Sequence, residues 1–178
     1  MSNNLRSLEG IREKLQRAQA RFCRVADAIR AEDWERQPAP GSWSAGEIVA
    51  HLTVVERGII RNADRITQQA EMRIPFRRRL HLPLWLVEAR IIRRKSPVPQ
   101  DPGLMAEKET MLACLRGARE RTLAFLFEME KTNLRAYCWR HPFLGMLNAY
   151  EWMEMIAAHQ IRHAKQMKEV EESFSRKL

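Results

Sequence analysis

Two histidines, His159 and His163, lie four residues apart in the segment AAHQIRHAKQ (157–166). In a helix, side chains with this spacing lie one turn apart on the same face. The apolar stripe of the surrounding segment includes both, so both imidazoles should face the interior. A neutral imidazole in the interior needs partners for its N–H group and its lone pair. The pair therefore predicts either hydrogen-bonded core histidines or two ligands of one metal ion.

A third histidine, His51, lies on the apolar stripe of an earlier segment, GSWSAGEIVAHL (41–52). A single histidine on such a face is more often a hydrogen-bonded core residue than a ligand. Three histidines that face one interior make a metal site the better interpretation. Each ring needs a partner, and a divalent cation would accept one lone pair from each. We therefore predict a mononuclear metal site made by His51, His159 and His163.

Three protein ligands leave at least one coordination position open, as in catalytic zinc sites. A metal lowers the pKa of a bound water and ionises a bound thiol, so either could attack a small electrophilic substrate. The sequence offers no clear separate nucleophile. Glu47, one turn before His51, is a candidate outer base, although its spacing from Ser44 favours a capping role. His141 is expected in a solvated loop before the last helix, where it could line the mouth of the site.

Four amphipathic segments must hold these side chains. Alternating three- and four-residue apolar steps predict helices at about 4–31, 44–72, 102–130 and 148–173, with an insertion at about 73–100. No convincing strand separates them, so we expect an all-α four-helix bundle that forms a single domain over 1–178. The helix starts are predicted by the caps Ser44 with Glu47, Asp101 with Pro102, and Asn148 with Glu151.

Composition sets the broad class of the protein. The 178 residues are 45% hydrophobic and 30% charged, which excludes a disordered chain and fits one well-buried domain. Three widely spaced cysteines without a CxxC pair indicate neither a disulfide framework nor a thiolate metal site, and Cys23 and Cys114 are expected to be buried. With no signal region and no apolar run of about 20 residues, we expect a cytoplasmic protein.

The positive charge of the chain is concentrated in the insertion. Residues 73–95 contain eight basic residues and one acid, a balance of +7 out of a total of +9. Apolar residues around Trp85 lie between the arginines, so this partly helical segment could cover the site as a lid or make a weak contact with an anionic membrane surface. We favour the cover, with Trp34, Trp43 and Trp152 as further walls of the cavity. No specific nucleic-acid binding is expected, because stacking aromatics do not accompany the arginines.

The pattern W…P.PGSWSAGEIVAHL, followed later by HPFLGMLNAYEWMEMIAAHQIRHAKQM, resembles the DinB-like (DinB/YfiT) family of four-helix metalloenzymes. The resemblance covers about Trp34 to Met167. It implies that His51, His159 and His163 form a metal-binding triad for zinc, nickel or a similar divalent ion. It also implies an up-down-down-up bundle, frequent homodimers and, in some branches, thiol-dependent transferase or isomerase activity.

Three functions from different classes follow. The preferred one is a divalent-metal-dependent hydrolase or thiol-dependent transferase that acts on a small electrophile. The second is a non-enzymatic, stress-related bundle that binds a metal or another ligand. The third is a peripheral membrane or nucleic-acid-associated protein that uses the arginine-rich insertion. Metal analysis separates the first two from the third, and activity with and without a thiol separates the two chemistries.

Overall fold

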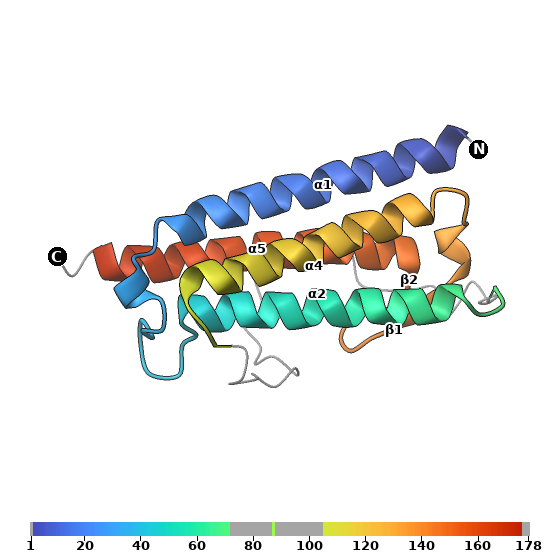
Figure 1. The fold of residues 1–178 in the computed structure, drawn as a ribbon. Helices are drawn as coiled ribbons and strands as arrows, with labels where there is room; N and C mark the ends of the chain where they lie inside the picture. Colours follow the sequence, from blue (N-terminus) through green and yellow to red (C-terminus); the bar gives the residue numbers. More distant parts are fainter. Residues whose placement is uncertain (1, 72–86, 88–104, 176–178) are drawn as a thin grey trace.

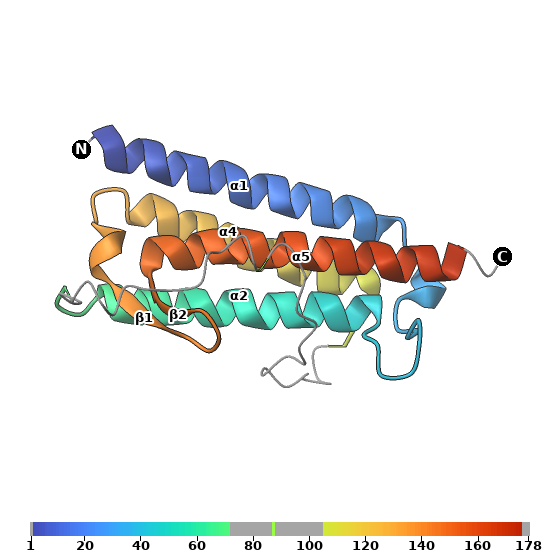
Figure 2. The same ribbon diagram turned by 180° about the vertical axis from the view of Figure 1, so that it is seen from behind.

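Four long helices form the bundle in the computed structural model, which describes residues 2–71, 87 and 105–175. They are α1 (Ser2–Asp27), α2 (Ala45–Thr67), α4 (Lys108–Glu128) and α5 (Ala149–Ser175). In Figure 1, α1 and α5 run in one direction and α2 and α4 in the other. This is the expected up-down-down-up order, in which α1 lies along α5 and α2 lies along α4 (Figure 2).

Reciprocal capping boxes start the two helices that carry the histidines. At α2, the Ser44 hydroxyl accepts a hydrogen bond from the Glu47 backbone N–H, and the Glu47 carboxylate accepts one from the Ser44 N–H. At α5, Asn148 and Glu151 form the same exchange at 2.9 Å in both directions. Each box satisfies N–H groups that a helix start leaves free, so both predicted starts are confirmed within one residue.

The apolar stripes face inward, as their spacing predicts. On α1 they include Leu8, Leu15 and Phe22, all fully buried. The buried apolar residues form two clusters, one around Leu15 and Phe125 and the other around Phe22 and Leu115. A layer of polar side chains lies where the helices pass from one cluster to the other. Its buried members are His51, Glu56, Arg119, Thr122, Gln160 and His163, and the half-buried His159 lies with them.

A short β-hairpin precedes α5, where the sequence predicted only a loop. Strands β1 (Cys138–His141) and β2 (Gly145–Asn148) pair antiparallel, with His141 opposite Gly145. Gly145 has a φ of +97°, a conformation that favours glycine and closes the turn. The hairpin packs on α5 through Trp139, which stacks on Trp152 with ring centroids 5.0 Å apart. Strands of four residues with a single buried position each carry too little alternation for sequence analysis to detect.

Three predicted helix boundaries are wrong. The first helix ends at Asp27 rather than near 31, because the chain turns at Ile29 and is extended at Arg30 before a 3-10 turn at Ala31–Asp33. The second helix ends at Thr67 rather than near 72, because the chain turns at Gln68 and Gln69 and residues 70–71 are not helical. The third helix starts at Lys108, since residues 105–107 are not helical. The Lys108 ammonium donates to the carbonyls of Asp27 and Ile29 and so ties this start to the end of α1. The Asp101 cap lies outside the described residues.

Most of the basic insertion also lies outside the described residues, including Trp85 and the arginines of 73–95. Val87 is described, and it packs against the core cluster around Leu15. In the parts of the chain that the structure describes, no helix has the length and apolar character to cross a membrane. The roles of the insertion as lid or membrane contact stay predictions.

Candidate metal centre

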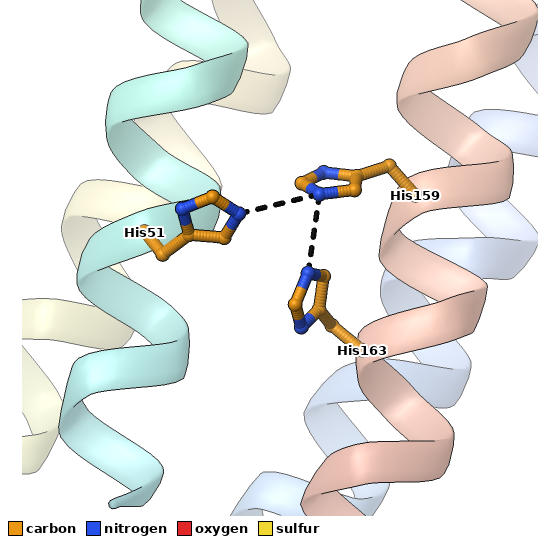
Figure 3. Close-up of side chains that lie close together, drawn as sticks. All are labelled: His51, His159 and His163. Atoms are coloured by element: carbon orange, nitrogen blue, oxygen red, sulfur yellow. Dashed lines mark hydrogen bonds between the residues drawn. The ribbon is translucent and has the colours of Figure 1, made fainter. Parts of the chain in front are cut away.

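The structure brings the three predicted histidines together between α2 and α5. The Nε2 atom of His159 lies 3.3 Å from Nε2 of His51 and 3.1 Å from Nε2 of His163 (Figure 3). All three ligand nitrogens lie within 4.8 Å of one another. Two of these residues come from one helix and the third from the facing helix, as the stripes predict. Figure 3 shows the three rings pointing toward one common space.

The spacing of the nitrogens fits a divalent ion. Nitrogens at about 2.0–2.1 Å from a tetrahedral zinc ion are about 3.3–3.4 Å from each other, close to the observed 3.1 and 3.3 Å. The protonation pattern fits as well. Nδ1 of His163 lies 2.9 Å from the Gln166 side-chain oxygen and donates to it, so Nε2 of this ring carries a lone pair. A single cation among the three rings can accept a lone pair from each of them. Without a cation, an N–H group on one ring can donate to only part of the set, so at least one lone pair lacks a partner.

Burial keeps the three rings neutral, which is the form that binds metals. It lowers the pKa of His51 to about 4 and that of His159 to about 3, and it places the pKa of His163 well below the ordinary 6.5. The neighbouring positive charge of Arg162 lowers the pKa values of His159 and His163 further. At neutral pH each ring therefore offers a lone pair without first releasing a proton.

Two residues beside the cluster, Gln166 and Arg162, were missed by the sequence analysis. Gln166 lies three residues after His163, and Arg162 lies three residues after His159. A polar side chain one turn from a candidate ligand is a detectable signal, because it can orient the second ring nitrogen. Arg162 donates to the Val87 carbonyl at 3.3 Å. A neutral histidine set beside a guanidinium makes the site electropositive.

The predicted aromatic walls divide into three cases. Trp43 borders the cluster, with its ring centroid 4.9 Å from His51 and its plane nearly parallel to that of His163. Trp152 contacts His141 rather than the cluster. Trp34 is buried in the core beside Met111, to which its indole N–H is directed at 3.3 Å, so its predicted place in the wall is wrong.

The structure gives Glu47 and His141, the two candidate residues outside the metal triad, different surroundings. Glu47 is held by its capping box, with its carboxylate 2.7 Å from the Ser44 N–H. His141 is not the solvated loop residue that was expected, because it ends strand β1 and packs against Trp152 at 5.0 Å. Burial lowers its pKa to about 4. The expectation that Cys114 is buried is also wrong, whereas Cys23 is half-buried.

A second polar cluster lies in the same layer and joins all four helices; we call it the ion-pair network. Arg119 of α4 binds Glu56 of α2 through two bonds of 2.7 and 3.0 Å, and both side chains are about 95% buried. Arg119 also donates to the Leu15 carbonyl of α1 and to the Gln160 oxygen of α5. Thr122 donates to Glu56 at 2.7 Å. One buried donor, Nε2 of Gln160, has no acceptor among the described residues.

Comparison with known proteins places this site in a family. A model of the DinB superfamily matches residues 14–167. The uncharacterised protein YuaE of Bacillus subtilis (strain 168) is 24% identical over 146 residues, which cover 82% of this chain and 87% of YuaE. The structure of YfiT from Bacillus subtilis superposes with a TM-score of 0.67 at 12% identity, covering 94% of this chain and 87% of YfiT. YfiT is described as a probable metal-dependent hydrolase with an unusual four-helix bundle topology.

Proposed function

Since the chain belongs to the DinB superfamily, we propose that it is a divalent-metal-dependent enzyme whose metal is held by His51, His159 and His163. The observation that carries this proposal is the meeting of three neutral imidazoles, with Nε2 of His159 3.3 Å from that of His51 and 3.1 Å from that of His163 and all three ligand nitrogens within 4.8 Å. These are the only three such groups that converge within the described residues, so a fourth position stays open to a small molecule. Zinc and nickel are among the metals that imidazole ligands suit, and we propose one of these two.

The proposed reaction is attack on a small electrophile by an activated water or by a low-molecular-weight thiol. A divalent ion in such a site lowers the pKa of a coordinated water or thiol toward neutrality. The chain itself would hold the ion, orient His163 through Gln166, and limit access of water with Trp43. Because Glu47 is engaged in its capping box, we assign it no proton transfer. A homodimer and a cytoplasmic location stay predictions.

Metal titration is the first test of the proposal. Zinc and nickel are titrated into the full chain by calorimetry, with metal content measured independently on purified protein. We expect one ion per chain in the wild type and no stoichiometric binding in His51→Ala, while circular dichroism shows both folded. His141→Asn is the matched control, since it removes a histidine outside the cluster. Equal metal content in wild type and His51→Ala would refute the assignment.

Activity assays then separate the two chemistries. Hydrolysis of p-nitrophenyl acetate by the metal-loaded chain tests water activation, and transfer of cysteine or glutathione to monobromobimane tests thiol activation. The His51→Ala variant sets the background in both assays. Metal binding without either reaction would favour the alternative of a non-enzymatic metal-binding bundle.

A further inference from the structure

The two ring nitrogens of His141 have different surroundings: Nδ1 accepts hydrogen bonds from the hairpin turn, and Nε2 can donate one to a ligand. The backbone N–H groups of Phe143 and Leu144 both donate to Nδ1 of His141 at 3.1 Å. A nitrogen that accepts two hydrogen bonds carries a lone pair, so the proton of the neutral ring must be on Nε2. Two ring nitrogens point in diverging directions, and Nε2–H therefore points away from the turn. It has no acceptor among the described residues.

The hairpin holds this ring against α5, on the face that also carries His159. Trp152 contacts both Trp139 and His141, in each case with ring centroids 5.0 Å apart. Its indole N–H also donates to the Trp139 carbonyl at 3.3 Å. Trp152 lies seven residues before His159 and thus on the same face of α5. His141 is close enough to His159 that its charge lowers the pKa of that ring.

The fixed tautomer determines what His141 can do. Protonation of Nδ1 would place an N–H opposite two other N–H groups, and burial also disfavours the charged ring, whose pKa falls to about 4. At neutral pH the ring is therefore neutral and donates in one fixed direction, through Nε2–H. In addition to burial, Arg162 and His141 both act on His159, and their positive charges lower the pKa of that ring, so the space next to His159 is electropositive. A fixed donor in such a place suits an anionic oxygen.

We propose that His141 is a substrate-binding residue whose Nε2–H donates to an anionic oxygen of the small molecule that occupies the site. This inference rests on the proposed function, because it assumes that the histidine cluster holds a metal to which that molecule is brought. It assigns the substrate class as an electrophile or thiol that carries, or develops, a negatively charged oxygen such as a carboxylate.

Two substitutions separate the two nitrogens of His141. In His141→Asn the side-chain oxygen replaces Nδ1 as acceptor for the turn, whereas the donor at the Nε2 position is lost. In His141→Gln the longer amide can place an N–H near the Nε2 position, whereas the acceptor for the turn is lost. A purely structural role of His141 makes Gln the more damaging change, and a substrate-binding role makes Asn the more damaging one.

The probe is acetohydroxamate, which binds zinc as an oxygen anion, titrated by calorimetry into the zinc-loaded full chain. We expect about tenfold weaker binding in His141→Asn and a loss within about threefold in His141→Gln, as for one hydrogen bond to a charged group. Zinc affinity should be the same in all three proteins. Nitrogen-15 NMR of the histidine rings should show His141 as the Nε2–H tautomer in wild type.

Each remaining outcome counts against the inference. An Nδ1–H tautomer, wild-type affinity in His141→Asn, or equal losses in both variants would overturn it and leave the metal proposal standing. If His141→Gln does not fold, the comparison of His141→Asn with wild type decides alone. A wild-type chain that binds no zinc would instead overturn the proposed function, and the substrate role of His141 with it.

Discussion

The histidine cluster and the ion-pair network lie in the same layer of the bundle, yet they solve burial in opposite ways. In the ion-pair network, Arg119 and Glu56 neutralise each other and join all four helices. In the histidine cluster, three rings of the same kind face each other with lone pairs that they cannot all satisfy. The ion-pair network is complete in the folded chain, whereas under the proposed function the histidine cluster is completed by a cation from outside.

This difference indicates that the ion-pair network serves the stability of the fold, whereas the histidine cluster serves its function. A buried ion pair with good geometry resists separation, because each charge would be costly alone. Burying a neutral imidazole without a hydrogen-bond partner costs less free energy than burying an unpaired charge. The histidine cluster can therefore stay folded before a ligand binds. The network thus fixes the relative positions of α2 and α5 on which the cluster depends.

The largest expected effect comes from breaking the ion-pair network. Arg119→Met leaves Glu56 buried without its partner, so the free energy of unfolding should fall by about 3–5 kcal/mol. Urea unfolding followed by circular dichroism measures it. The double variant Arg119→Met with Glu56→Leu should recover part of the loss, because no isolated charge is left. A single variant within about 1 kcal/mol of wild type would mean that the network is not the buried anchor described here.

The next effect is a pH dependence that belongs to the histidine cluster. The pKa values of His51 and His159 are about 4 and about 3 in the folded chain, against an ordinary 6.5. As pH falls from about 6.5 to about 4, the unfolded metal-free chain binds protons that the folded chain does not, so the free energy of unfolding falls. It levels off once the folded rings also protonate.

The control for this pH dependence is a variant with His159→Gln and His163→Gln, which lacks two of the titrating rings. Urea unfolding of both metal-free proteins at steps of pH compares their slopes. The slope between about pH 6.5 and 4 should be shallower in the variant, since fewer protons are taken up on unfolding. Equal slopes would show that the cluster does not titrate as its burial implies.

A smaller effect is expected from the side chain that orients His163. Gln166→Leu removes the acceptor 2.9 Å from Nδ1, so zinc affinity should fall by about 10–100-fold with little change in the stability of the metal-free chain. Gln166→Glu keeps an acceptor and should bind zinc at least as tightly as wild type. Competition with a chelator measures both. Identical zinc affinities in the Leu and Glu variants would show that Gln166 does not orient His163 for metal binding.

The smallest effect distinguishes the capping role of Glu47 from a chemical one. Ser44→Ala should lower the free energy of unfolding by about 1 kcal/mol and leave zinc affinity unchanged. Glu47→Gln keeps a side-chain acceptor for the Ser44 N–H, so its stability and turnover should both stay close to wild type. A variant that is fully stable but inactive would restore Glu47 as a proton-transfer residue.

Much of the fold could be predicted from the sequence because its signals are local or periodic. The apolar stripes on α1 and α5 recur at helical spacing, and the capping boxes at Ser44 and Asn148 mark two starts within a few residues. The same periodicity placed His159 and His163 on one face. The meeting of His51 with them followed from stripes that must share one interior.

Other features depend on contacts between distant segments, and only the tertiary structure decided them. His141 precedes a proline in sequence, yet the pairing with Gly145 and the contact with Trp152 turn it into a fixed donor. The partnership of Arg119 with Glu56 links residues 63 positions apart, which no local pattern specifies. A periodic stripe shows which side of a helix is buried, but the partner of a buried polar group is set by how the helices align along their length. That alignment is a property of the packed bundle as a whole.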